Sequence, residues 1–171
     1  MGTTSNYSQS YPSIAGLDNG KYIANWEVWD ASRNLKEIYR KTAKPGSSSN
    51  SMLVTSSIVN KGKPRVSKLS NGGFVTTWYE FNKKITVIYG RIYNETEGIL
   101  VNQLIIAPSS TFNQSAPAVA GLAEGRFVIV WQSESQNLDG SGIFAQIFSP
   151  TGEATFYGCT NQNDCSSDTP I

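Results

Sequence analysis

The chain carries one pattern of apolar and polar positions three times. Each copy has a proline first, a β-branched residue two positions later, a leucine at five, a glycine at eight and a tryptophan at fourteen. An aromatic and a β-branched residue stand side by side at ten and eleven. The copies begin about 52 residues apart and read PSIAGLDNGKYIANW (12–26), PRVSKLSNGGFVTTW (64–78) and PAVAGLAEGRFVIVW (117–131). Repeats of this period are typical of blades and other repeat architectures.

Each copy predicts four short β-strands. Apolar runs stop at a glycine-containing turn and resume after it, which indicates a β-hairpin. These turns are Asp18-Asn19-Gly20, Asn71-Gly72-Gly73 and Glu124-Gly125. A third run follows at 37–40, 86–93 and 142–148, and a fourth at 52–54, 100–107 and 154–157. No segment has a convincing helical period, so we expect an all-β protein with helix only in stray turns.

The proline that opens each copy is taken as the start of a unit. We therefore expect repeats at 12–63, 64–116 and 117–157, the last of them incomplete. Residues 1–11 are expected to be the tail of a preceding repeat, and residues 158–171 a polar, cysteine-containing tail.

The four-stranded antiparallel unit fits a β-propeller blade. In such blades Trp26, Trp78 and Trp131 would fill the core between neighbouring units. A β-trefoil or β-prism is the alternative, because either fold uses three units completely. Three blades are fewer than the usual four to eight or so, and a propeller would therefore need blades from other copies of the chain or from neighbouring repeat units.

The third copy is followed by Asp139-Gly140-Ser141-Gly142-Ile143. Together with the pattern P-x-[IV]-x-x-L-x-x-G-x-[FY]-[IV]-x-x-W, this run resembles the repeats of very large secreted or surface proteins of bacteria and ciliates. The similarity covers nearly the whole chain as far as Gly152 and is closest in the third copy. The resemblance implies a propeller-like repeat in an extracellular adhesive or structural protein, and it implies no catalytic residues.

Composition excludes several function classes. The chain has 14 Lys and Arg against 13 Asp and Glu, so charge gives no reason to expect a nucleic-acid partner. It contains no histidine, which rules out Ser-His, Cys-His and His-metal sites built from this sequence. No apolar run is long enough to span a membrane. We expect an extracellular or cell-surface location.

The cysteines and sequons point to the same location. Cys159 and Cys165 stand in the polar C-terminal segment, where a local disulfide is expected and free thiols are the alternative. Asn6, Asn94 and Asn113 each begin an Asn-x-Ser/Thr triplet and are candidate glycosylation sites.

Two kinds of binding site are candidates. Trp29, Tyr79 and Tyr93 stand near strand ends and could stack on a sugar, although burial between units is the alternative for Trp29. Asn137, Asp139 and Ser141 alternate in a loop and could turn their oxygens toward calcium, with a plain Asx turn as the alternative. No other cofactor is expected.

Four carboxylates follow the tryptophans by one to four positions and could face a common rim: Glu27, Asp30, Glu80 and Glu134. Glycoside hydrolysis needs such a pair in a cleft, but solvated strand ends show the same recurrence. We therefore expect no enzyme. The expected function is an extracellular structural or adhesive module that binds through its inter-strand loops, and the alternative is a lectin with repeated weak sites for glycans.

Overall fold

The computed structural model describes residues 7–47, 49–55, 58–81, 84–106, 112–134 and 140–159. These residues form twelve strands in three four-stranded antiparallel sheets. The first sheet comprises β1 (Tyr7–Gly16), β2 (Tyr22–Asp30), β3 (Leu35–Ala43) and β4 (Met52–Leu53). The second comprises β5 (Asn60–Lys68), β6 (Phe74–Phe81), β7 (Thr86–Tyr93) and β8 (Ile99–Ile105). The third comprises β9 (Gln114–Gly121), β10 (Phe127–Glu134), β11 (Ser141–Phe148) and β12 (Ala154–Cys159).

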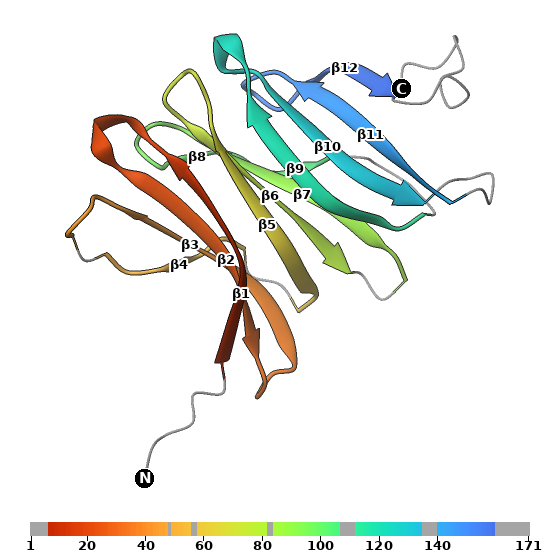
Figure 1. The fold of residues 1–171 in the computed structure, drawn as a ribbon, viewed down its shortest axis with the longest axis horizontal. Coiled ribbons are helices and arrows are strands. Elements are labelled where there is room, and N and C mark those ends of the chain that lie inside the picture. The colour runs from red at the N-terminus through yellow and green to blue at the C-terminus, as the bar shows by residue number, and fades with distance from the viewer. Residues whose placement is uncertain are drawn as a thin grey trace.

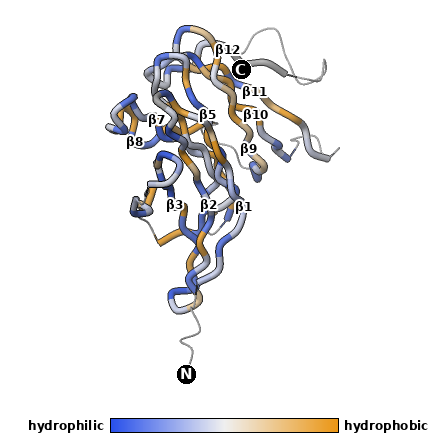
Figure 2. The backbone as a smooth tube through the Cα atoms, turned by 60° about the vertical axis from the view of Figure 1, so that its left-hand side comes forward, coloured by the Kyte–Doolittle hydropathy of each residue, from blue (hydrophilic) through white to orange (hydrophobic). Residues whose placement is uncertain are grey.

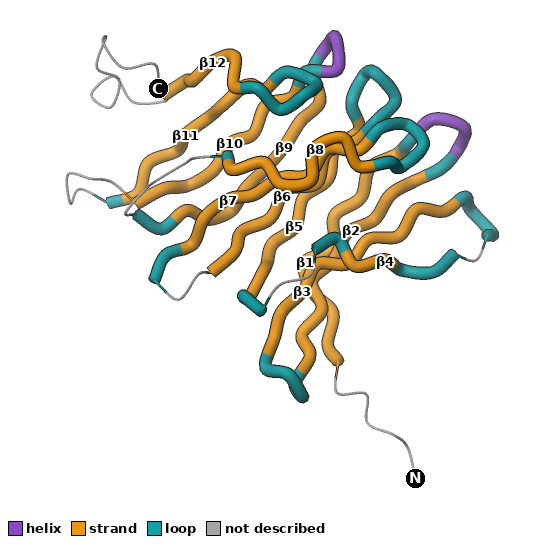
Figure 3. The backbone as a smooth tube through the Cα atoms, turned by 180° about the vertical axis from the view of Figure 1, so that it is seen from behind, coloured by secondary structure: helices purple, strands orange, loops and turns teal. Residues whose placement is uncertain are grey.

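The sheets are consecutive propeller blades. In each sheet the spatial order of the strands follows the sequence, and the three sheets stand side by side (Figure 1). The first strands β1, β5 and β9 contact one another in turn, while the view from behind brings the fourth strands β4 and β8 forward (Figure 3). The expectation of an all-β, blade-like repeat fold is confirmed, and helix is limited to the short 3₁₀ turns Asp18–Gly20 and Ala123–Gly125 in the described residues.

The glycine of the repeat makes the turn between the first two strands. Gly20, Gly72 and Gly125 have φ values of 69°, 86° and 71°. This left-handed region is open to glycine without a Cβ clash. The recurring glycine is therefore explained by backbone geometry.

The proline of the repeat lies inside a strand, which corrects the expected unit boundaries. The preceding residues Tyr11, Lys63 and Ala116 have φ values of 51°, 49° and 50°, and a bulge shifts the strand register at the same point. A first strand has a sheet neighbour on one side only, so a proline there need not break the ladder. Residues 7–11 thus belong to the first blade, with Ser10 opposite Glu27.

The hydrophobic core lies between the blades. Trp78 is buried against Ile38 and Val54 of the first blade, and Trp131 is buried in a larger cluster between the second and third. Figure 2 shows hydrophobic stretches along the strands and hydrophilic ones at many of the connections. The inter-blade role predicted for Trp78 and Trp131 is confirmed, whereas Trp26 is half-buried. No helix among the described residues is long and apolar enough to cross a membrane.

Candidate functional site

A pocket of about 410 Å³ opens where the second strands end and the third strands begin. It is lined by Lys36, Asn60, Lys63, Tyr79, Phe81, Thr86 and Ser115. These residues come from all three blades, and Phe81 and Thr86 flank the connection between β6 and β7. The pocket's described lining residues include two lysines and no carboxylate. It is therefore a basic, partly aromatic recess formed by the segments that follow the repeat's tryptophans together with the starts of the first strands β5 and β9.

A buried carboxylate lies beside the pocket. Glu27 is 2% exposed, and its Oε1 accepts hydrogen bonds from Lys36 Nζ at 2.9 Å and from Ser10 Oγ at 3.4 Å. Its Oε2 is buried and has no hydrogen-bond partner among the described residues. The hydrogen bond to Glu27 raises the pKa of Lys36. One oxygen of Glu27 is thus held in place, and the other has unused capacity to accept a proton or a hydrogen bond.

Tyr79 shares a small space with this carboxylate. A Cβ placed on Gly62 would lie 2.5 Å from the Tyr79 hydroxyl and 2.7 Å from Glu27 Oε2. Both oxygens therefore face the space that the missing side chain leaves. Burial raises the pKa of Tyr79, and the nearby Glu27 raises it further. At neutral pH, Tyr79 is a phenol that can donate a hydrogen bond beside a carboxylate that can accept one.

The other carboxylates after the tryptophans do not share this arrangement. Asp30 is paired with Arg33 at 2.5 Å, and hydrogen bonds from Ser32 and Arg33 lower its pKa to about 2. Glu80 accepts a hydrogen bond from a tryptophan indole at 3.0 Å, and Glu134 accepts two from the side-chain amide of Asn113. The expected common rim is thus not a set of similar acids: all four have structural partners, but only Glu27 has a buried oxygen without a partner among the described residues.

The structure separates the three aromatic ligand candidates. Tyr79 lines the pocket, and Trp29 lies opposite Lys36 in the β2–β3 register, two residues after the buried carboxylate. Tyr93 is buried, and its ring stacks on Phe74 with 4.5 Å between centroids. The prediction that Tyr93 contacts a ligand is therefore corrected, because its ring belongs to the core between the first two blades.

The expected calcium and disulfide sites fall largely outside the described residues. Asn137, Asp139 and Cys165 lie outside them, and the side chain of Cys159 is not described. Ser141 is exposed at the start of β11. The described part of the chain contains no group of three His, Cys, Asp or Glu residues able to hold a metal ion. Calcium and the disulfide stay predictions.

The sequons lie in different surroundings. Asn94 is in an exposed turn, where its Oδ1 accepts hydrogen bonds from the backbone of Thr96 and Gly98. Asn113 is engaged between blades, because its Oδ1 accepts the Thr86 N–H at 3.1 Å and its Nδ2 donates to a carboxylate. A glycan on Asn113 would have to displace the second contact. Asn6 lies outside the described residues.

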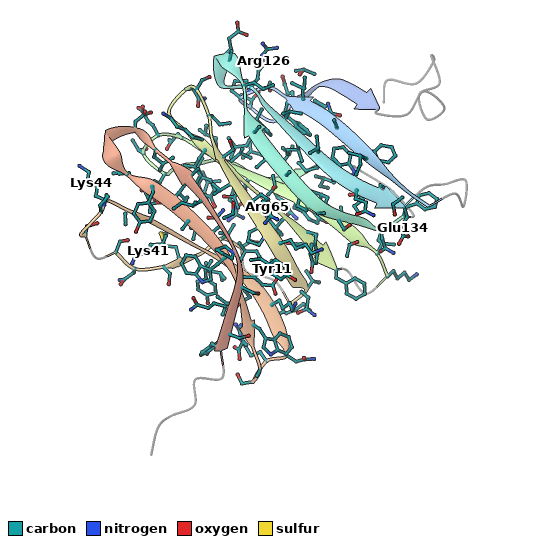
Figure 4. All side chains as sticks on the ribbon, in the orientation of Figure 1. Tyr11, Lys41, Lys44, Arg65, Arg126 and Glu134 are labelled. Carbon is teal, nitrogen blue, oxygen red and sulfur yellow. The ribbon has the colours of Figure 1, made fainter. Side chains whose placement is uncertain are left out.

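Sequence reasoning missed the pocket residues Lys36 and Asn60, and also Gly62 beside Glu27 and Tyr79. One signal was available, because Asn60 and Asn113 each stand four positions before a repeat proline. Asn60 Oδ1 accepts the Lys36 backbone N–H at 2.8 Å, the counterpart of the Asn113 contact in the next blade. The backbone that carries the Lys36 side chain is thus held by this recurring contact. Figure 4 shows Tyr11 and Arg65 in the region where the first two blades lie side by side.

No protein-family model matches the chain, and no curated protein matches it. Solved structures do. A Hadza microbial sialidase matches with a TM-score of 0.63 at 12% identity, over 88% of this chain and 38% of its own. An endo-arabinase from Bacteroides thetaiotaomicron matches with a TM-score of 0.61 at 12% identity, over 95% of this chain and 66% of its own. The GH93 α-L-arabinofuranosidase of Fusarium graminearum, solved with arabinobiose, matches with a TM-score of 0.59 at 11% identity, over 92% and 50%.

These similarities establish the fold, and this chain spans less than two thirds of each of the three enzymes. They also correct one expectation. The repeats led us to expect no enzyme, but all three neighbours are named as glycosidases, so the blade fold gives no ground for excluding catalysis. The expectation of a non-enzymatic chain is wrong on this evidence.

Proposed function

We propose that this chain is a carbohydrate-active propeller segment that binds a glycan in the pocket and cleaves a glycosidic bond there. In this proposal Glu27 is the base, and Tyr79 is the group whose oxygen attacks the sugar. The proposal places this activity outside the cell, which agrees with the sequons at Asn94 and Asn113.

One observation carries the proposal: a buried carboxylate oxygen without a partner among the described residues faces a tyrosine hydroxyl next to a pocket. A buried acceptor without a hydrogen bond costs free energy, so such groups need an explanation. Sugar hydroxyls would supply the missing donor to Glu27. The rings of Tyr79 and Phe81 in the pocket wall give a sugar ring an apolar surface to pack against.

The chemistry follows from the two groups. Lys36 holds Oε1 of Glu27 in place, and Oε2 is the oxygen proposed to act as the base. Tyr79 has a raised pKa and keeps its proton at neutral pH until a base takes it. In the proposed step Glu27 accepts this proton while the Tyr79 oxygen bonds to the anomeric carbon, the glycosidic C–O bond breaks, and the leaving alcohol takes the proton from Glu27. Water then cleaves the bond between the tyrosine and the sugar, which returns a proton to the Tyr79 oxygen and releases the sugar. The proximity of both oxygens to the space beside Gly62 supports this assignment. Tyrosine is a known alternative to a second carboxylate in glycosidases.

Binding without cleavage is the second candidate, because the three blades repeat the same loop positions and suit multivalent attachment to glycans. An adhesive module would use the pocket and Trp29 to hold a glycan and release it unchanged. Both functions require glycan binding, and only the first includes cleavage of the bound glycan.

The test is a panel of chromogenic glycosides and polysaccharides, assayed for hydrolysis, together with a glycan array for binding. We expect wild-type protein to bind and cleave at least one member. Glu27→Gln and Tyr79→Phe should each lower the rate of cleavage at least about a hundredfold, as expected for a group that takes part in proton transfer. Glu124→Gln, in the exposed turn before β10, is the matched control and should behave as wild type.

The outcomes separate the candidates. Binding that is weakened by Trp29→Ala, without hydrolysis of any substrate, would support the adhesive function instead. Absence of both binding and hydrolysis across the panel would contradict both. Hydrolysis that survives in both Glu27→Gln and Tyr79→Phe would place the chemistry elsewhere.

A further inference from the structure

Every blade has two different faces, and the two internal blade junctions bring the same pair together. The tryptophan face of the second blade packs on the first, with Trp78 against Ile38 and Val54. The tryptophan face of the third packs on the second, where Trp131 and Ile88 share one buried cluster. We call the opposite side of each blade, which carries Ile38 or Ile88, its isoleucine face. One rule thus holds at both junctions: a tryptophan face covers the isoleucine face of the preceding blade.

The tryptophan face of the first blade is not covered by any other blade among the described residues. Trp26 stacks on Tyr39 at 6.4 Å, the same separation as the corresponding aromatic pair of the second blade, yet Trp26 is half-buried while Trp78 is fully buried. Ile14 in the first blade and Val66 in the second occupy the same repeat position, two residues after the proline, on the tryptophan face of their blades. Ile14 is 68% exposed and Val66 is 7% exposed. The first blade therefore presents the apolar surface that its successors bury.

The isoleucine face of the third blade is likewise not covered by another described blade. Ile143 occupies the place of Ile38 and Ile88 in the strand register, but it is 51% exposed where they are fully buried. Val128 takes the place of Val75 and is half-buried, whereas Val75 is fully buried. The two open surfaces are thus the two unlike halves of one repeating junction.

We propose that a second copy of this chain covers both faces, so that two copies close a six-bladed ring. The tryptophan face of one copy packs on the isoleucine face of the other, with Ile14 near Val128 and Trp26 near Ile143. The same junction forms twice, which closes the ring after two copies. Two sets of three blades lie within the usual range of about four to eight, and three sets exceed it.

The complementarity favours a copy of the chain as the occupant. Covering Trp26 and Ile143 with each other reproduces contacts that already exist twice in the chain, without any new kind of interface. Each face exposes a large apolar side chain, and burying them removes apolar area from water. The proposal does not depend on carbohydrate activity, because its readout is molecular mass.

The test measures mass by light scattering or sedimentation over a range of concentrations. We expect a particle of twice the 18.6 kDa of one chain. Ile14→Arg on one face and Ile143→Asp on the other should each raise the dissociation constant at least about tenfold, because each places a charge in an apolar junction. Both side chains are exposed within one chain, so the variants should fold.

Mixing the two variants gives the sharper result. In a mixed dimer one junction contains both substitutions and the other contains neither, so dimers should reappear on mixing. Ile58→Arg, at a 92% exposed position in the connection between β4 and β5, is the control and should dimerise as wild type does.

The proposal is overturned if wild-type protein is monomeric throughout, which would leave the two faces to further blades of the same polypeptide. It is also overturned if neither face variant changes the mass. Failure of the mixture to recover dimers would show that like faces meet, and would refute the head-to-tail junction.

Discussion

The side-chain oxygen of Asn113 accepts the backbone N–H of Thr86 at 3.1 Å and so joins the third blade to the second. Asn60 makes the same contact with the Lys36 N–H, joining the second blade to the first. Both contacts lie at the start of a third strand, beyond the stretch that the fourth strand pairs with: β4 pairs with Tyr39 and Arg40, and β8 pairs with residues 89–93. A side-chain amide thus fastens each junction at the end that carries the pocket.

Asn113→Ala should therefore destabilise the fold. It removes the acceptor for the Thr86 N–H and both hydrogen bonds to Glu134. Leaving a part-buried donor without a partner costs about 1–3 kcal/mol, and we expect a loss of that size in the free energy of unfolding. Urea denaturation measures it. Asn102→Ala, at an exposed position on β8, should change the free energy of unfolding by less than about 0.5 kcal/mol.

A second variant distinguishes stabilisation by the Asn113 hydrogen bonds from stabilisation by a glycan on Asn113. Ser115→Ala destroys the Asn113 sequon and keeps the amide. If Ser115→Ala costs as much stability as Asn113→Ala in glycosylating cells, the stabilisation comes from a sugar rather than from the hydrogen bonds.

Acid titration tests the hydrogen bonds around Asp30. Its carboxylate accepts bonds from the Ser32 hydroxyl at 2.6 Å and from Arg33 Nε at 2.5 Å, which lower the Asp30 pKa from 3.8 to about 2. Because the folded pKa is below the unfolded one, ionised Asp30 stabilises the fold above about pH 4. That contribution is lost as the pH falls toward 2. Asp30→Asn should be less stable than wild type at pH 6, and the difference should shrink on acidification.

The cause of the shift can be tested directly. Ser32→Ala removes the contact that lowers the Asp30 pKa most, so NMR titration should show the pKa moving back toward 3.8. A pKa of about 2 that survives both Ser32→Ala and Arg33→Gln would contradict this account.

Much of the fold could be predicted because a repeated apolar pattern means a repeated core. Trp78 and Trp131 recur at one repeat position, and both are buried at blade junctions as expected. The proline could not be placed correctly from the pattern. The left-handed residue before it is Tyr, Lys or Ala in the three copies, so no shared residue type marks the bulge that lets the strand continue.

The site was harder to predict than the fold. Tyr79 was named as an aromatic and Glu27 as one of four similar carboxylates, but nothing in the sequence distinguishes Glu27 from the others. Its environment depends on Ser10, on Lys36 across the β2–β3 pair and on Gly62 in the next blade. These residues are distant in sequence, and they meet because blades pack face to face.

The ion pair between Glu27 and Lys36 should contribute more than an exposed pair. Glu27 is buried, and the Lys36 side chain is 37% exposed, so water screens the pair only partly. A double-mutant cycle with Glu27→Gln and Lys36→Met should give a coupling energy of about 1–3 kcal/mol, between the values for exposed and fully buried pairs. Lys68 and Asp18, an ion pair at 2.5 Å with both side chains exposed, provide the matched cycle.

The Lys68–Asp18 cycle should give less than about 1 kcal/mol. Equal coupling energies in the two cycles would show that burial of Glu27 adds nothing, and that its carboxylate is better solvated than its exposure indicates.

Gly62→Ala tests whether the gap between Glu27 and Tyr79 needs a glycine. The new methyl would lie 2.5 Å from the Tyr79 hydroxyl and 2.7 Å from Glu27 Oε2, so both side chains must move. We expect a loss of about 1–3 kcal/mol in the free energy of unfolding, as for overpacking, together with loss of glycan binding. Gly16→Ala is the control, because a Cβ on Gly16 meets nothing within 4 Å. Its effect on stability should stay below about 0.5 kcal/mol.

Repeating Gly62→Ala in a Tyr79→Val background identifies the source of the loss. Valine suits a strand and removes the phenol that the methyl would meet, so the cost of Gly62→Ala should fall in this background. An unchanged cost would mean that the methyl collides mainly with Glu27. Loss of binding in Gly62→Ala with stability intact would instead show that the gap is occupied by the ligand, because only a bound group would then compete with the methyl for the space.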